Sequence, residues 1–156
     1  MPGISAMTAD FLAQKRIAVF GISRKQDSTA GLIYRKLKAN GYQVYAIHPQ
    51  AETFDGDPYY PDVKSTPERP DAAMIVTRPA LTEQIVRDCA EAGVRWVWMH
   101  CSLMTAGASV SEAAVEFCRA NGITVIPGGC PMMYYRPDLG HKLMRWMMRM
   151  TGSLPK

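Results

Sequence analysis

The chain has 156 residues, a formal net charge of +4, and 47% hydrophobic residues. This length suits one domain with a proper core, and the composition is that of an ordinary globular protein. The basic residues form no dense block with interleaved aromatics, so a nucleic-acid partner is not expected. No apolar run approaches the roughly 20 residues of a membrane span, and the N-terminus shows no secretion signal, so we expect a cytoplasmic protein without a membrane partner.

The hydrophobic pattern predicts strands that alternate with helices along the chain. The expected strands are 16–20, 43–47, 72–76, 96–99 and 124–126, and the expected helices are 8–14, 29–40, 80–92, 109–121 and 139–151. Thr8 is expected to cap the first helix and Asp138 the last. This alternation predicts an α/β fold, a Rossmann-like doubly wound parallel five-stranded sheet (order 3-2-1-4-5) with helices on both faces and an extra C-terminal helix.

Two further features are the longest connection and the four cysteines. The connection over residues 50–71 is polar and rich in proline, and its length is typical of a functional lid or a partly ordered segment. Cys89 and Cys118 fall within helical patterns, while Cys101 and Cys130 follow predicted strands. Because there is no C-x-x-C pair and no zinc-finger spacing, neither a redox motif nor a metal site is supported.

The first strand and the turn after it give the clearest indication of function. The strand ends at Gly21, and a helical pattern begins about eight residues later. A strand, a glycine turn and a helix direct backbone N–H groups at one point, which is a common way to hold a phosphate. Arg24 and Lys25 add positive charge to this turn. The fingerprint G-x-G-x-x-G is incomplete, because Ser23 stands at its second glycine, so phosphate binding and plain architecture both stay open at this point.

Ligands of open α/β sheets bind outside the carboxyl ends of the strands. The residues expected to bind a cofactor there are Gly21, Ile22, Ser23, Arg24, Lys25, His48, Pro49, Thr77, Arg78, Pro79, Cys130 and Pro131. His48 occupies the place where an NAD site has an acidic residue, and Arg24, Lys25 and Arg78 offer positive charge. The site therefore favours an anion richer in phosphate than NAD.

A family resemblance rests on several short motifs in a fixed order. They are A-V-F-G-I-S at 18–23, H-P at 48–49, Y-P at 60–61, V-T-R-P at 76–79, the strand at 96–99 and C-P-M-M-Y-Y at 130–135. In this order the chain resembles the small single-domain CoA-binding proteins, which are similar to the CoA-binding N-terminal domain of the succinyl-CoA synthetase α subunit. The resemblance covers about residues 8–136 of one domain that spans 1–156, and the helix at 139–151 lies beyond it.

The resemblance implies a Rossmann-like domain that binds coenzyme A or an acyl-CoA at the C-terminal edge of the sheet. The pyrophosphate would lie on the first βα turn, and the adenosine between the turns at 48–49 and 78–79. The chain departs from the family pattern at His48, at Gly128-Gly129 and in the sequence Met-His-Cys-Ser at 99–102. These departures concern the pantetheine end of the site more than the nucleotide end.

No catalytic residue is expected, because the phosphohistidine of the synthetase belongs to a second domain. His100 and Cys101 are adjacent in one strand end and would point to opposite sides, so they are a poor nucleophile–base pair. A catalytic or metal-binding pair of Cys130 and His100 is a minor alternative. We expect Cys130 to line the cleft instead, where a CoA thiol could form a mixed disulfide with it.

Two other functions stay open. One is an NAD(P)-binding oxidoreductase-type Rossmann domain, which the incomplete glycine pattern and the absent acidic residue disfavour. The other is a regulatory or interaction domain with a vestigial nucleotide cleft. The helix at 139–151 carries an apolar stripe opposite Lys142, Arg145 and Arg149. Packing on the sheet edge or a homodimer is favoured over a membrane-surface or partner helix.

Overall fold

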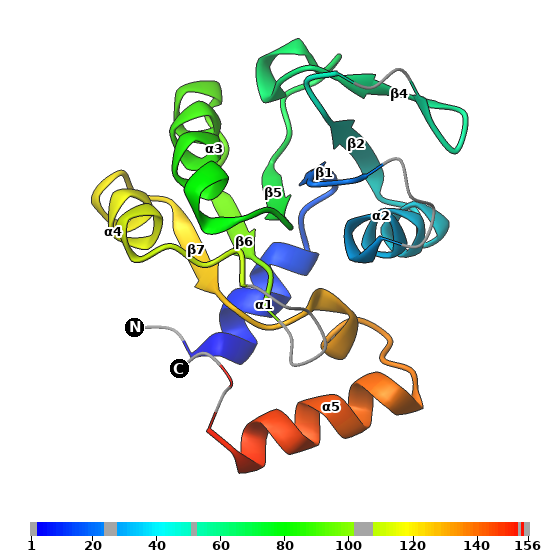
Figure 1. Ribbon diagram of the computed structural model, residues 1–156, viewed down its shortest axis with the longest axis vertical. Helices are drawn as coiled ribbons and strands as arrows, with labels where there is room; N and C mark the ends of the chain where they lie inside the picture. The colour runs from blue at the N-terminus through cyan, green and yellow to red at the C-terminus, as the bar shows by residue number, and fades with distance from the viewer. Residues whose placement is uncertain (1–2, 24–27, 51–52, 102–107, 153, 155–156) are drawn as a thin grey trace.

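A central β-sheet with helices on both faces forms the fold (Figure 1). The computed structural model describes residues 3–23, 28–50, 53–101, 108–152 and 154. Within them the sheet has seven strands in the order β3-β4-β2-β1-β5-β6-β7, and all neighbours are parallel except the β3–β4 hairpin. The strands are β1 (Arg16–Phe20), β2 (Gln43–Ile47), β3 (Thr53–Phe54), β4 (Asp57–Tyr60), β5 (Ala72–Ile75), β6 (Trp96–Met99) and β7 (Thr124–Pro127).

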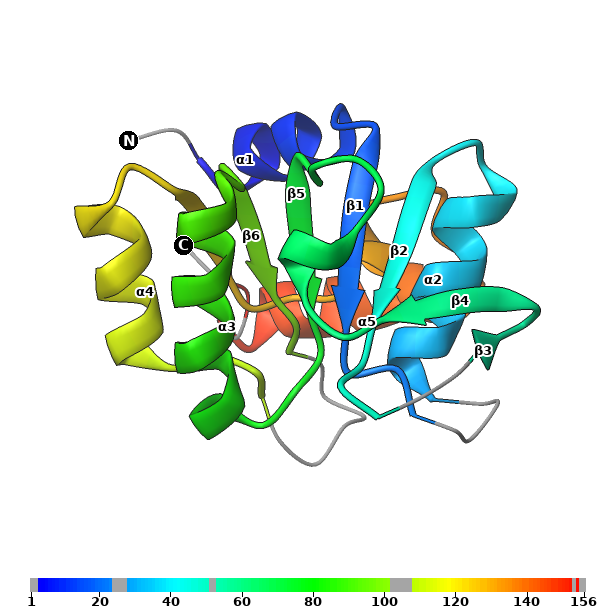
Figure 2. The same cartoon turned by 90° about the horizontal axis from the view of Figure 1, so that it is seen from above.

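The helices divide between the two faces of the sheet. They are α1 (Ile4–Leu12), α2 (Thr29–Ala39), α3 (Pro79–Ala92), α4 (Glu112–Ala120) and α5 (Leu139–Met150), with short 3-10 helices η1 (Val63–Ser65) and η2 (Pro131–Met133). Figure 2 shows α3 and α4 in front of the sheet, with η1 on the same side, and α1, α2 and α5 behind it. None of the helices in the described parts of the chain is long and apolar enough to cross a membrane.

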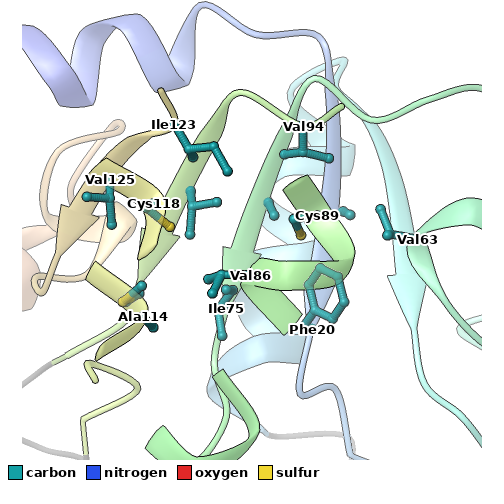
Figure 3. Packing of buried hydrophobic residues seen from close by; sticks show 14 of the residues in the cluster. Phe20, Val63, Ile75, Val86, Cys89, Val94, Ala114, Cys118, Ile123 and Val125 are labelled. Carbon is teal, nitrogen blue, oxygen red and sulfur yellow. The ribbon is translucent and has the colours of Figure 1, made fainter. Parts of the chain in front are cut away.

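Each face of the sheet has its own hydrophobic core. Phe20 and Ile75 pack against Val86 and Cys89 of α3 on one face (Figure 3). On the other face, Ile17 and other sheet side chains pack against α1 and α2. All four residues of β5 are buried because that strand lies between β1 and β6 with both faces covered. The prediction of an α/β fold with a mostly parallel sheet is therefore confirmed.

The predicted strand number and strand order are wrong. The order 3-2-1-4-5 would put the strand at 72–76 beyond β2, whereas β5 pairs with β1 and β6. The reason lies in the connection predicted to be a lid or a partly ordered segment. It forms the β3–β4 hairpin, and β4 pairs with the outer edge of β2, so β5 lies on the other side of β1. Asp55 and Gly56 make the turn with φ values of 51° and 83°, as a two-residue hairpin loop requires.

Two predicted helix starts are also wrong. α1 begins at Ile4, so Thr8 lies inside the helix, where its buried hydroxyl donates to the Ser5 carbonyl oxygen over 3.0 Å. α4 begins later than predicted, because the Ser111 hydroxyl accepts a hydrogen bond from the Ala114 N–H and so caps the helix there. Asp138 does cap α5 as predicted, since its carboxylate accepts from the His141 N–H over 2.8 Å.

Helix α5 packs against the rest of the protein through a side other than its predicted apolar stripe. Met148 is buried against Cys130 and Met133, and Met144 packs beside them. The predicted apolar stripe, which includes Leu139 and Trp146, is instead exposed. The stripe therefore does not pack on the edge of its own sheet.

Candidate functional site

A cleft of about 450 Å³ opens at the carboxyl ends of β1 and β2, on the face that α3 covers. Its lining includes residues 21–23 after β1, residues 48–49 after β2, Thr77 after β5, residues 61–63, and one side of α3. This volume is within the usual range for small-molecule sites. The chain leaves β1 toward α2 on one face and leaves β5 toward α3 on the other. The two connections diverge, and such a switch point is where open α/β sheets bind ligands.

Gly21 brings the turns after β1 and β5 together. Its φ of +94° lies in the region that favours glycine, and a Cβ at this position would lie 1.9 Å from the Val76 carbonyl oxygen. Only a residue without a side chain lets the two backbones approach this closely. The next residue, Ile22, is fully buried in the core on the α2 side. The first βα turn is thus fixed against the end of β5, at the floor of the cleft.

His48 lines the cleft and is held by the β3–β4 hairpin. Its backbone N–H donates to the Tyr60 carbonyl oxygen over 2.9 Å, and its ring packs edge-on against Tyr59 with centroids 5.5 Å apart. The Nδ1 atom accepts from the Gln50 N–H over 3.1 Å, so a neutral imidazole carries its proton on Nε2. The hairpin that the sequence analysis missed therefore orients one of the predicted site residues.

Thr77 belongs to a partly buried hydrogen-bond network at the start of α3. Its N–H donates to the Ser109 hydroxyl over 3.0 Å, and its hydroxyl lies 3.1 Å from that of Thr82. The Thr82 proton goes to a carbonyl oxygen, that of Ser109 at 2.8 Å or that of Arg78 at 3.3 Å, so Thr77 is the donor to Thr82. The network fixes the cleft wall, and the Thr77 N–H is already used within the protein.

The described lining of the cleft is apolar apart from a few polar side chains. Leu81 and Ile85 of α3 form one wall, and two carboxylates, Asp62 and Asp88, also face it. The Asp62 carboxylate caps η1 by accepting from the Ser65 hydroxyl and N–H, and these hydrogen bonds lower the pKa of Asp62. Asp88 accepts from the Gln84 side chain over 2.9 Å. Asp62, Leu81 and Ile85 were not among the predicted site residues.

Six of the twelve predicted site residues line this cleft, namely Gly21, Ile22, Ser23, His48, Pro49 and Thr77. Arg24 and Lys25 lie outside the described residues. Arg78 and Pro79 begin α3 as exposed residues next to the cleft but are not part of its lining. The sequence missed the α3 wall because Leu81 and Ile85, four residues apart, carry the same pattern as a helix face buried in the core.

Cys130 and Pro131 lie elsewhere. Cys130 is buried with Met133 and Met148, and burial raises the pKa of its thiol to about 11. Cys130 is not part of the described lining of the cleft, so the expectation that it lines the cleft is wrong. A buried, protonated thiol is a poor partner for disulfide exchange, and this burial disfavours the expected mixed disulfide with a CoA thiol. His100 is also buried, and burial lowers its pKa to about 4. Among the described residues, no group of three or more His, Cys, Asp or Glu could hold a metal ion.

Comparisons with known proteins match most of the chain. A family model described as a CoA binding domain matches residues 15–136. Acetate–CoA ligase [ADP-forming] I of Archaeoglobus fulgidus is 28% identical over 120 residues, which are 74% of this chain and 18% of the ligase. Acetate–CoA ligase [ADP-forming] II subunit alpha of Pyrococcus furiosus is 27% identical over 129 residues, 77% of this chain and 27% of that subunit. The chain therefore spans less than a third of the length of these relatives.

A solved structure supports the fold independently. A hypothetical protein from Pyrococcus horikoshii OT3 superposes with a TM-score of 0.75 at 24% identity, covering 86% of this chain and 91% of that one. At this identity the likeness concerns the fold alone. It indicates that the arrangement of strands and helices occurs in another small protein of nearly the same extent.

Proposed function

The chain belongs to the family of CoA-binding domains, and we propose that it binds coenzyme A or an acyl-CoA in the cleft where β1 and β5 diverge. The observation that carries the proposal is the cleft itself, which combines the Gly21 turn with an open volume of about 450 Å³ beside it. Family membership supports the class of ligand, and the switch point of the sheet supports the choice of this cleft as its site.

In this proposal, different parts of the ligand lie against chemically different parts of the cleft. Its apolar wall at Leu81 and Ile85 suits the face of an adenine ring, and the carboxylates of Asp62 and Asp88 suit an exocyclic amine or ribose hydroxyl groups. Phosphates would be repelled by those two carboxylates. In this proposal they lie instead on the backbone turn that begins at Gly21, with Arg78 beside the cleft. Arg24 and Lys25 follow in the sequence and stay predicted contacts outside the described residues.

The proposal is one of binding without catalysis. The relatives named above are ligases, and this chain corresponds to a small part of them. Among the described lining residues, the Asp62 carboxylate caps η1 and the Thr77 hydroxyl donates to Thr82, so we assign neither a catalytic role. The thiol end of the ligand would leave the cleft away from Cys130, which lies in the cluster beneath α5.

Calorimetric titration of the full chain with CoA, acetyl-CoA, dephospho-CoA and NADH tests the proposal. We expect CoA and acetyl-CoA to bind with similar affinity, dephospho-CoA to bind more weakly, and NADH to bind weakest. Arg78→Ala should weaken CoA binding in a salt-dependent way, whereas Arg119→Ala, an exposed arginine of α4, should not. No affinity for CoA at millimolar concentration, or tighter binding of NADH, would refute the proposal.

A further inference from the structure

Helix α5 presents five large apolar side chains to solvent. Leu139, Leu143, Trp146, Met147 and Met150 are between 45% and 84% exposed, and we call them the outer stripe. At about 100° per residue they fall within an arc of roughly 100° on the helix surface. Isolated exposed apolar residues are ordinary, but a contiguous stripe along three turns marks an interaction surface.

The outer stripe is opposite the side by which α5 is attached. Met148 is buried against Cys130 and Met133, with Met144 beside it. Met144 and Met148 lie about 120° and 160° around the helix from the centre of the stripe. The protein therefore holds α5 by one side and leaves the other side without any covering element among the described residues. In Figure 1, α5 lies at the margin of the molecule, away from the sheet.

The positive charge of the chain gathers at this helix. Residues 1–130 contain 13 basic and 13 acidic residues, whereas residues 131–156 contain five basic residues and one acidic residue. The net charge of +4 thus belongs entirely to the last segment. Within α5 there is no acidic residue, and Lys142, Arg145 and Arg149 all lie on the same flank of the outer stripe. The acidic residue, Asp138, is already paired with the His141 ring.

This charge pattern decides between occupants of the stripe. In an antiparallel pair of α5 helices, like flanks meet, so Lys142 of one copy would lie near Arg149 of the other. In a parallel pair, the basic flank would face the flank with Gly140 and Thr151, which carries no charge. Neither arrangement gives the basic side chains an anionic partner. An anionic lipid surface accepts the apolar stripe and supplies phosphate groups along its basic flank.

We propose that α5 anchors this chain on anionic lipid surfaces. The outer stripe enters the boundary between head groups and acyl chains, with the helix lying in the membrane plane, and Lys142 and Arg149 reach lipid phosphates. Arg145 already stacks on Tyr134, with its guanidinium carbon 4.6 Å from the ring centroid, so it contributes less. The proposal concerns a surface on the opposite side of the sheet from the α3-lined cleft and does not depend on the ligand of that cleft.

Co-sedimentation of the full chain with vesicles tests this proposal. We expect binding to phosphatidylcholine vesicles that contain 30% phosphatidylglycerol and at least tenfold weaker binding to pure phosphatidylcholine vesicles. Lys142→Gln/Arg149→Gln should lower the partition coefficient about 25-fold, since each basic side chain near an anionic surface contributes about fivefold. Lys15→Gln/Arg119→Gln removes the same charge from exposed positions elsewhere and should leave binding unchanged.

A test variant and a matched control variant probe the apolar outer stripe. Leu143→Gln should weaken binding, whereas Leu32→Gln, at a similarly exposed position of α2, should not. Trp146 is 59% exposed, so its emission should shift to the blue on vesicles, and Trp146→Phe should remove that shift. Equal thermal midpoints would show that the variants remain folded.

Two results would overturn the proposal. One is equal binding, or no binding, on the two kinds of vesicle. The other is a dimer in analytical ultracentrifugation that dissociates on Leu143→Gln while the vesicles bind nothing, which would identify a second copy of the chain as the occupant.

Discussion

Gly21 offers the sharpest test of how the cleft is built, because Gly41 provides a matched control. Both glycines have nearly the same positive φ, +94° and +88°, but a Cβ on Gly21 would meet the Val76 carbonyl oxygen at 1.9 Å while a Cβ on Gly41 would meet nothing within 4 Å. The backbone penalty for an L-residue at such φ values is about 1–2 kcal/mol and applies to both. The difference between the two variants therefore isolates the close approach of β1 and β5.

The magnitude follows from the geometry. Gly41→Ala should lower the free energy of unfolding by about 1–2 kcal/mol, from the backbone term alone. Gly21→Ala carries that term and in addition must displace the turn by roughly an ångström, since Cβ contacts under 3.0 Å essentially never occur. Overpacking of this kind typically costs a further 1–3 kcal/mol. The total for Gly21→Ala is then about 2–5 kcal/mol, and the displaced turn should also weaken CoA binding.

Urea unfolding of both variants, followed by CoA titration under native conditions, measures these effects. The expected result is a larger loss of stability for Gly21→Ala, with weaker CoA binding for that variant alone. Equal losses of stability would mean that the turns after β1 and β5 do not touch as described. A large loss of stability with unchanged CoA affinity would separate the first βα turn from the ligand site.

The remaining predictions concern the cleft wall and two buried titratable groups. Leu81→Asp should weaken CoA binding at least about tenfold in calorimetry, because about 1.5 kcal/mol of apolar contact is lost. The control Leu32→Asp on α2 should leave the affinity for CoA unchanged. Equal effects of the two substitutions would show that α3 is not part of the binding site. Burial lowers the pKa of His100 to about 4, below its value of about 6.5 in the unfolded chain. Between these two pH values the unfolded state binds more protons than the folded state. The free energy of unfolding should therefore fall as the pH drops from about 6.5 to 4. His100→Gln should flatten that part of a urea-midpoint profile, and an unchanged slope would contradict the assignment. Burial also raises the pKa of Cys130 to about 11. At pH 8 the folded protein should therefore react with iodoacetamide at Cys130 far more slowly than the urea-unfolded chain, as measured by peptide mass spectrometry. Similar rates for the two states would mean that the thiol is accessible in the folded protein.

The sequence predicted the elements of the sheet well where periodicity and glycine turns agree. The predicted bounds of β1, β2 and β6 coincide with the observed ones. These segments are short apolar runs bounded by turn residues, and neighbouring parallel strands cover them on both edges. The family was also predicted correctly, from motifs that lie at the strand ends and in the turns after them.

The strand order could not be read from the same pattern. It depends on residues 53–60, whose strands are only two and four residues long, too short for hydrophobic periodicity to give a signal. The Asp55-Gly56 pair is a hairpin signal that could have been used. Which side of β1 receives β5 is then decided by tertiary packing, because β4 already occupies the free edge of β2.

The candidate site was predicted in part for a related reason. Residues 21–23 and 48–49 were found because the rule for parallel sheets points to strand ends. The side chains of Leu81 and Ile85 belong to a helix face that looks the same whether it contacts a core or a ligand. Cys130 was misplaced because a strand end was assumed to face the cleft, whereas the chain turns there into η2 and packs under α5.

The β3–β4 hairpin has a consequence for how copies of this chain can meet. β3 is two residues long and forms the outermost strand on that side, and Pro58 in β4 lacks a backbone donor. Very short edge strands offer almost no free backbone groups to an incoming strand. Growth of the sheet into a continuous intermolecular sheet is thus blocked at this border, and association through that border would have to rely on side chains alone.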